Sequence, residues 1–192
     1  MEYYVEITLI PSSDISLNFL WEKIFRLIHL KLVEIKAMDK KIPIGIGFPG
    51  YQSDGLPLGN KLRLFAPSMD DLKRLNLNSG LSGFKGYVSL TEIEKVPDKI
   101  ERYSCFNRVQ RKTNKERLAR RRAKRLKISY EQALDDFKDF KKKLIKIPFI
   151  KMKSQSTGEN FHFFIQRHEF TTPINEGFGS YGLSKRSTVP EF

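Results

Sequence analysis

Few side chains in this chain could do chemistry, and its three histidines come first. His29, His162 and His168 do not stand at zinc-binding spacing from one another or from the single cysteine. The acidic pairs at 70–71 and 135–136 fall in helical stretches, where neighbouring side chains point about 100° apart, so neither pair converges on a metal. The sequence also has no Walker-type phosphate loop. It therefore predicts no metal site and no cofactor, and it leaves proton transfer by histidine as the candidate chemistry.

One reaction needs only such a group. The 2′-hydroxyl of RNA can attack its own adjacent phosphate, which leaves a 2′,3′-cyclic phosphate and a 5′-hydroxyl. The attack requires a base that works near neutral pH, in-line geometry and donors to the phosphate oxygens, and histidine is the natural base. A positioned base typically accelerates such a step by about 10²–10⁴-fold.

Each candidate residue for this reaction also has an ordinary structural interpretation. His29 lies on a predicted helix, in line with Glu22 and Arg26 at the edge of an apolar stripe, which also suits a surface or boundary histidine. His162 stands between two phenylalanines in a strand pattern, "SQSTG" at 154–158 is typical of a polar turn, and Tyr181 could be a packing aromatic. The residue types alone leave these roles open.

The most unusual segment is a basic run. Residues 111–127 hold ten Lys or Arg and one Glu, a net charge of +9 (10 − 1) in a chain whose total is +13. Thr113 and Glu116 form a capping-box pattern that predicts a helix start. At helical spacing, most of the basic side chains share one broad arc: Arg117, Arg120, Arg121, Lys124, Arg125 and Lys127. Leucines and alanines fill much of the other side, with Lys115 and Arg122 intruding.

This charge distribution and the sequence pI of about 9.8 indicate a polyanionic partner such as nucleic acid. A solvated charged face remains an alternative, although surfaces usually mix charges of both signs. A membrane-surface helix is another, but the apolar side is mostly alanine. An arginine helix could enter the major groove of DNA. The major groove of A-form RNA is deep and narrow, so a short hairpin suits the helix better than a long RNA duplex.

Hydrophobic periodicity predicts the elements that must position these groups. We expect a strand at 2–10, a helix at 16–37 capped by Ser16, strands at 42–50 and 60–67, a helix at 68–77 and a strand at 86–97. This order predicts an α+β protein whose residues 1–97 form a ferredoxin-like βαββαβ domain. Residues 98–192 should form an RNA-binding region with the arginine-rich helix, a further helix at 128–148, a β-hairpin at 149–170 and a Gly/Ser-rich C-terminal loop.

The compartment follows from simpler features. Cys105 is the only cysteine, so no internal disulfide can form, which suits a reducing cytoplasm. The first residues lack a positively charged leader followed by an apolar run. The chain has no stretch of about 18 apolar residues. We therefore expect a cytoplasmic protein without a signal peptide or membrane partner.

Together these segments resemble one known family, the CRISPR repeat-processing endoribonucleases of the type I-F system. The resemblance runs along nearly the whole chain. It is carried by "NRVQ" (107–110), "NKERLARR" (114–121), "SQSTGENFHFFI" (154–165) and "YGLSK" (181–185), together with a histidine on the first helix. The four segments are specific as a set, whereas each alone is weak. The resemblance implies metal-independent cleavage at the 3′ base of a CRISPR repeat stem-loop, retention of the product, and assembly with other subunits of a surveillance complex.

The resemblance also assigns roles residue by residue. It implies that His29 is the base for the 2′-hydroxyl, that Ser154 holds or orients the nucleophile, and that Tyr181 positions the histidine. Arg108 and Gln110 would read bases at the foot of the stem, and Phe161 would stack on a nucleotide. The other expected RNA-binding residues are Arg120 and Lys124 on phosphates, Arg121 and Arg125 in the major groove, and Ser156 and Thr157.

Two alternatives from other classes stay open at this point. A non-catalytic RNA-binding protein of ferredoxin-like fold would need the arginine helix but not His29. A DNA-binding architectural protein would prefer duplex DNA to an RNA hairpin at the same salt concentration.

Overall fold

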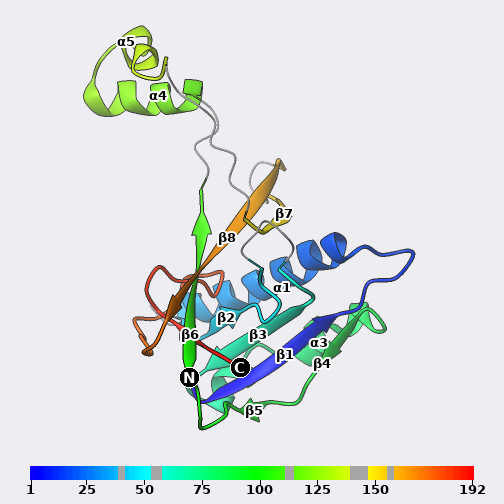
Figure 1. Ribbon diagram of the computed structural model, residues 1–192. Coiled ribbons are helices and arrows are strands. Elements are labelled where there is room, and N and C mark those ends of the chain that lie inside the picture. The colour runs from blue at the N-terminus through cyan, green and yellow to red at the C-terminus, as the bar shows by residue number, and fades with distance from the viewer. Residues whose placement is uncertain (39–41, 53–57, 111–114, 139–146, 155–157) are drawn as a thin grey trace. The chain divides into compact units, whose positions relative to one another are not determined.

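A computed structural model describes residues 1–38, 42–52, 58–110, 115–138, 147–154 and 158–192. The chain divides into two compact units: Met1–Val109 with Lys146–Phe192, and Gln110–Ile145. We call them the main unit and the inserted unit. Helices and strands are labelled as in Figure 1.

The first sheet of the main unit is built around β1 (Tyr3–Leu9). It has the strand order β2-β3-β1-β4, where β2 is Gly45–Gly47, β3 is Lys61–Ala66 and β4 is Val88–Leu90. All of these neighbours pair antiparallel, and the short β5 (Glu94–Lys95) extends the pairing along β1. The alternation predicted for β1 is confirmed, because Val5, Ile7 and Leu9 are buried.

Helix α1 (Leu17–Met38) follows β1, as the apolar periodicity predicts, and supplies much of the core. Its first turn is capped by Ser16, whose hydroxyl accepts the Phe19 amide at 3.3 Å. One face is buried over its length through Leu20, Ile24, Ile28 and Leu32. Burying each such side chain contributes about 1.5–3 kcal/mol to folding, so this face fixes the rotation of the helix and with it the direction of every other side chain on α1.

The link from β3 to β4 contains short helices. They are α2 (Met69–Lys73), α3 (Leu77–Gly80) and the 3₁₀ turn η1 (Ser82–Phe84). Helix α2 is capped by Ser68, whose hydroxyl accepts the Asp71 amide. The predicted helix at 68–77 is interrupted, because Asn76 adopts a left-handed conformation with φ of 44°. The order strand, helix, strand, strand, helix, strand is nevertheless the predicted one.

A second sheet lies in the same unit, with strand order β7-β8-β6-β9. Its strands are β6 (Arg102–Val109), β7 (Phe149–Lys153), β8 (Asn160–Phe170) and β9 (Val189–Glu191). The hairpin of β7 and β8 is confirmed, with register from Phe149 opposite Phe164 to Lys153 opposite Asn160. Helix α1 packs against β7, and residues of both sheets share one hydrophobic core. The main unit crosses residue 97 and so contains parts of both predicted domains. The division of roles between residues 1–97 and 98–192 therefore stays a prediction.

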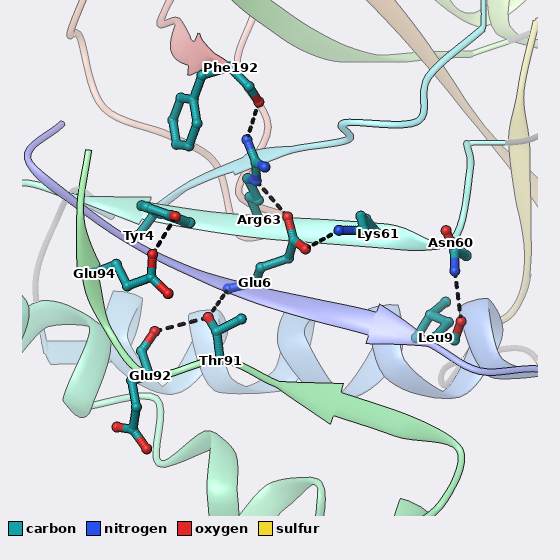
Figure 2. Close-up of polar contacts among 10 residues, drawn as sticks. All are labelled: Tyr4, Glu6, Leu9, Asn60, Lys61, Arg63, Thr91, Glu92, Glu94 and Phe192. Carbon is teal, nitrogen blue, oxygen red and sulfur yellow. Dashed lines mark hydrogen bonds and ion pairs between the residues drawn. The ribbon is translucent and has the colours of Figure 1, made fainter. Parts of the chain in front are cut away.

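The face of the first sheet opposite Val5, Ile7 and Leu9 carries a polar network, shown in Figure 2. Glu6 lies between Lys61 and Arg63, which donate to its two carboxylate oxygens at 2.6 and 2.7 Å. Burial raises the pKa of the Glu6 carboxyl, but hydrogen bonds from Lys61 and Arg63 and their charges outweigh burial, so its pKa is below the usual value. The network therefore holds an almost buried carboxylate in its charged form.

The inserted unit contains α4 (Lys115–Leu126) and α5 (Tyr130–Asp135). Helix α4 is the predicted arginine helix, although its proposed cap Thr113 lies outside the described residues. It ends where Lys127 turns to φ of 55° and the Ile128 amide donates back to the Ala123 carbonyl at 3.2 Å. Helix α5 starts with a capping box of Ser129 and Gln132 and is followed by a turn at 136–138, so the helix predicted at 128–148 is interrupted there, and its residues 139–146 lie outside the described residues.

Strands β6 and β9 were not predicted. In β6, Ser104, Cys105 and Phe106 are buried in succession, so no alternation marks the strand in the sequence. In the described parts of the chain, no helix is both long and apolar enough to cross a membrane.

Candidate functional site

The imidazole of His29 is held by two groups from one loop. Its Nδ1 lies 2.7 Å from the carbonyl oxygen of Ser180. The ring of Tyr181 stacks on it with centroids 3.8 Å apart and planes 5° from parallel. His29 stands on the half-exposed side of α1, whereas Ser180 and Tyr181 belong to the C-terminal loop, so the contact joins segments 151 residues apart. The structure thus brings together two of the three predicted catalytic residues.

The bond to Ser180 fixes which nitrogen of His29 carries a hydrogen. A carbonyl oxygen only accepts hydrogen bonds, so Nδ1 must donate and be protonated. In the neutral ring Nε2 then has the free lone pair. A histidine held in this tautomer, with its plane fixed by a stacked ring, is arranged to take a proton at Nε2.

Aromatic rings continue behind this pair. Phe25, one helical turn before His29, stacks with Tyr181 at 5.9 Å between centroids. Phe163 of β8 lies 4.6 Å from Tyr181 and 5.2 Å from Phe25. Both phenylalanines are buried, so Tyr181 packs against side chains that have little freedom to move. The position of the tyrosine ring in turn determines that of the imidazole.

Arg108 joins the same cluster from β6. Its guanidinium carbon lies 4.7 Å from the centroid of Phe163, 5.3 Å from Phe161 and 6.0 Å from Tyr181. These distances are in the range of cation–π attraction. Arg108 as a whole is exposed to solvent. Because its guanidinium lies over these rings, a positive charge stands beside the tyrosine that stacks on His29. The cluster therefore contains four predicted residues: His29, Tyr181, Arg108 and Phe161.

The loop that carries Ser180 and Tyr181 is hydrogen-bonded to β2 and to Ile42, three residues before that strand. The Phe178 amide donates to the Ile42 carbonyl at 3.1 Å, and the Ile46 amide donates to the Gly182 carbonyl at 2.9 Å. Gly182 has φ of +64°, and a Cβ there would lie 2.4 Å from Cγ1 of Ile46. Glycine is therefore required at this position for two reasons, its backbone conformation and the close approach of β2.

A second attachment joins the loop to β6. The Ser184 amide donates to the Phe106 carbonyl at 3.0 Å, and the thiol of Cys105 lies 3.3 Å from the Ser184 carbonyl. Cys105 is completely buried, and burial raises the pKa of its thiol. The only cysteine of the chain thus helps to position the loop.

Ser154, the third predicted catalytic residue, stands where β7 ends. Its amide donates to the Glu159 carbonyl at 2.8 Å, and its carbonyl accepts the Gly158 amide at 3.0 Å. These bonds close the predicted turn of the hairpin. Ser156 and Thr157 lie outside the described residues, so their role remains a prediction, as does that of Ser154.

The predicted phosphate- and groove-binding residues lie on α4. Arg120, Arg121, Lys124 and Arg125 are all exposed, while Ala119 is buried against the rest of the inserted unit. Arg122, which interrupts the apolar side of the helix, forms an ion pair with Asp136 just after α5. The exposed arc is therefore strongly basic, and Gln110, also exposed, belongs to the same unit.

Sequence reasoning missed the backbone carbonyl of Ser180 and the rings of Phe25 and Phe163. A carbonyl carries no side-chain signal. Phe25 could have been found from its spacing of four residues before His29, which puts both side chains on one side of a helix. Phe163 could have been found from Phe161, since alternate strand residues share a face. Among the described residues, no group of three or more His, Cys, Asp or Glu is arranged to hold a metal ion.

The fold and the site define a mixed α/β protein that combines an oriented histidine with an arginine-rich helix. A family model described as "CRISPR-associated protein (Cas_Csy4)" matches residues 4–192. The chain therefore belongs to the Csy4 family of CRISPR-associated proteins, and the resemblance inferred from the sequence is confirmed.

Two relatives match over the full length of both chains. The first, from Pseudomonas aeruginosa (strain UCBPP-PA14), is 35% identical over 193 residues. The second, from Escherichia coli (strain UTI89 / UPEC), is 31% identical over 193 residues. Each is named "CRISPR-associated endonuclease Cas6/Csy4". A solved structure titled "CRISPR associated protein Cas6" covers 99% of this chain and 98% of its own with 10% identity and a TM-score of 0.37, which is too low to add to the assignment.

Proposed function

We propose that this protein is a metal-independent endoribonuclease that binds the stem-loop of CRISPR repeat RNA and cuts at the 3′ base of the stem. The observation that carries the proposal is the hydrogen bond from His29 Nδ1 to the Ser180 carbonyl, because it leaves Nε2 as an acceptor. The names of the two full-length relatives support an endonuclease, and the exposed basic arc of α4 supports an anionic substrate.

In the proposed mechanism, His29 Nε2 takes the proton of the ribose 2′-hydroxyl. The 2′ oxygen then bonds to the adjacent phosphorus while the bond from phosphorus to the 5′ oxygen breaks. The departing oxygen takes up a proton from solvent and His29 returns its own proton to solvent, so the products are a 2′,3′-cyclic phosphate and a 5′-hydroxyl, and no water is consumed. Tyr181 keeps the imidazole plane fixed, and Ser154 holds or orients the nucleophile. Arg108 adds a positive charge beside the site, which favours the phosphate.

Binding is assigned to separate groups. Arg121 and Arg125 enter the major groove of the hairpin near its end, and Arg120 and Lys124 contact phosphates. Arg108 and Gln110 read bases at the foot of the stem, as bidentate side chains do. Phe161 stacks on a nucleotide, and Ser156 and Thr157 contact the RNA near the cut. Since the groove and phosphate contacts do not involve the broken bond, the product hairpin stays bound.

The strand order β2-β3-β1-β4, with a helix after β1 and after β3, supports a ferredoxin-like assignment for the N-terminal sheet. We also propose that the protein works in the cytoplasm and that its grip on the product hairpin delivers it to a type I-F surveillance complex with other subunits.

The test uses a labelled repeat hairpin and three proteins: wild type, His29→Ala and His168→Ala. His168 is exposed on β8 and is the matched control. We expect wild type and His168→Ala to cut equally in EDTA, and His29→Ala to bind the hairpin but cut at least about 100-fold more slowly, the lower range for a lost base. Cutting that needs a metal, or full activity of His29→Ala, contradicts the mechanism. Tight binding without cutting by wild type identifies a non-catalytic RNA-binding protein instead.

A further inference from the structure

The β7–β8 hairpin carries a second group of aromatic and basic side chains, on the face opposite Phe161 and Phe163. Along β7, Ile150 and Met152 are buried, whereas Phe149, Lys151 and Lys153 are exposed. Strand alternation therefore turns these three residues to the outer face of the hairpin. The register places Asn160 opposite Lys153, and His162 opposite Lys151. We call Phe149, Lys151, Lys153, Asn160 and His162 the outer strip.

The outer strip has a preformed aromatic end. The rings of Phe149 and His162 lie 4.3 Å apart between centroids, at 40°. Both rest on Phe164, at 5.4 and 5.9 Å, and Phe164 is buried. Phe149 nevertheless remains 41% exposed. A large aromatic ring held firmly from below and open above is suited to stacking with a flat partner.

The other end of the strip is cationic. Lys151 and Lys153 are exposed, and neither Phe149–Lys153 nor the facing residues 160–164 contain an acidic residue. Proteins commonly bind single-stranded nucleic acid with aromatic rings beside positive charges, because bases stack on the rings and phosphates bind to the charged side chains. A duplex does not offer its base faces in this way.

We infer that the outer strip binds single-stranded RNA continuous with the repeat hairpin, outside its stem. The inner face of the same hairpin carries Phe161, which lies beside Arg108. The two faces belong to the same pair of strands, so an RNA strand that leaves the stem beside the inner face can reach the outer strip by passing around the hairpin. The inference rests on the proposed function for the identity of the hairpin ligand.

The experiment compares the dissociation constants of the bare hairpin and of the same hairpin with flanks at the 5′ side, the 3′ side or both. The flanks and the nucleotides at the foot of the stem are 2′-deoxy, so no cutting occurs, while bases and phosphates are kept. Affinities are measured by fluorescence anisotropy at several stated salt concentrations. The proteins are wild type, Phe149→Ala and Lys151→Gln/Lys153→Gln. The control is Phe19→Ala/Lys23→Gln, since Phe19 on α1 is 43% exposed with Lys23 over its ring at 5.0 Å.

For wild type and the control we expect at least one flank to strengthen binding about tenfold, within the range for stacking of one base. Phe149→Ala should reduce this ratio to nearly one. Lys151→Gln/Lys153→Gln should make the salt dependence of flanked binding shallower by about 1.4 in log–log slope, about 0.7 for each phosphate contact. Thermal unfolding confirms that each variant is folded.

A wild-type ratio of one for all flanks, or a ratio that Phe149→Ala leaves unchanged, overturns the inference. A control variant that loses the gain as well overturns it too, because the effect would then not belong to the outer strip. These outcomes are independent of the proposed cleavage. A protein that gains affinity from a flank but never cuts RNA supports the strip and refutes the proposed function.

Discussion

Replacing Gly182 with alanine should release His29 without touching it. The Gly182 carbonyl accepts the Ile46 amide, and the preceding two residues supply the carbonyl and the ring that hold the imidazole. An alanine Cβ at 182 would lie 2.4 Å from Cγ1 of Ile46. Carbon atoms in ordinary contact stand about 3.5 Å apart or more, so the loop must move away from β2 by about 1 Å.

Two costs follow from this geometry. Alanine in the left-handed region costs about 1 kcal/mol, and the overlap with a buried isoleucine costs about 1–3 kcal/mol more. We therefore expect the free energy of unfolding to fall by about 2–4 kcal/mol. A shift of about 1 Å in a positioning group lowers activity by about 100-fold, so the rate of hairpin cleavage should fall by a similar factor.

The matched control is Gly86→Ala. Gly86 has φ of +86°, but a Cβ there would have nothing within 4 Å, so only the backbone cost applies. The assays are urea unfolding and single-turnover cleavage of the repeat hairpin with protein in excess, and hairpin affinity is measured separately. Ile46→Ala combined with Gly182→Ala should be less damaging than the sum of the two single changes, since the overlapping atoms are gone.

The reasoning would be wrong if Gly182→Ala were as stable and as active as Gly86→Ala. It would also be wrong if Gly182→Ala lost stability but kept its full cleavage rate, because the loop would then not position His29.

Two further predictions concern side chains. Tyr181→Phe keeps the stacked ring and should cut within about threefold of wild type, whereas Tyr181→Ala should lose about tenfold, the rate equivalent of one aromatic pair; equal rates for the two variants would contradict a positioning role for the ring. Glu6→Gln should lower the free energy of unfolding at pH 7 by about 2 kcal/mol, since charged hydrogen bonds are broken. Because the folded pKa of Glu6 is below its unfolded value, its contribution is present above the unfolded pKa and is lost as pH falls through the folded pKa, so urea unfolding should show the gap between the two proteins closing in acid. A gap that widens toward low pH would contradict this.

The sequence predicted the elements with strong periodicity. Helix α1 was recognisable because its apolar stripe and Ser16 cap point to one element, and the β7–β8 hairpin because a polar turn divides two strand patterns. Strand β6 was not recognisable, because its buried residues Ser104, Cys105 and Phe106 are consecutive and of mixed polarity, so the sequence shows no alternation of polar and apolar positions. The left-handed Asn76 that divides the second predicted helix depends on tertiary packing, which propensity does not record.

For the site, residue types indicated the chemistry but not the geometry. His29 and Tyr181 were named as candidates, yet their stacking depends on two loop attachments to β2 and β6 that involve mainly backbone groups. Such bonds leave almost no trace in the sequence beyond a glycine. The ion pair of Arg122 with Asp136 likewise explains why one arginine lies on the apolar side of α4. From helical spacing alone, this arginine was an unexplained exception to the separation of basic and apolar residues.

The burial of Cys105 has a practical consequence. Thiolate is the form that reacts with maleimides, and a thiol that is completely enclosed and has a raised pKa forms little of it. A cysteine introduced at an exposed position, for instance Lys124→Cys on α4, would then be the only site modified under mild conditions. The natural protein is therefore ready for selective attachment of fluorophores or spin labels to its basic helix, with the native sulfur left in place.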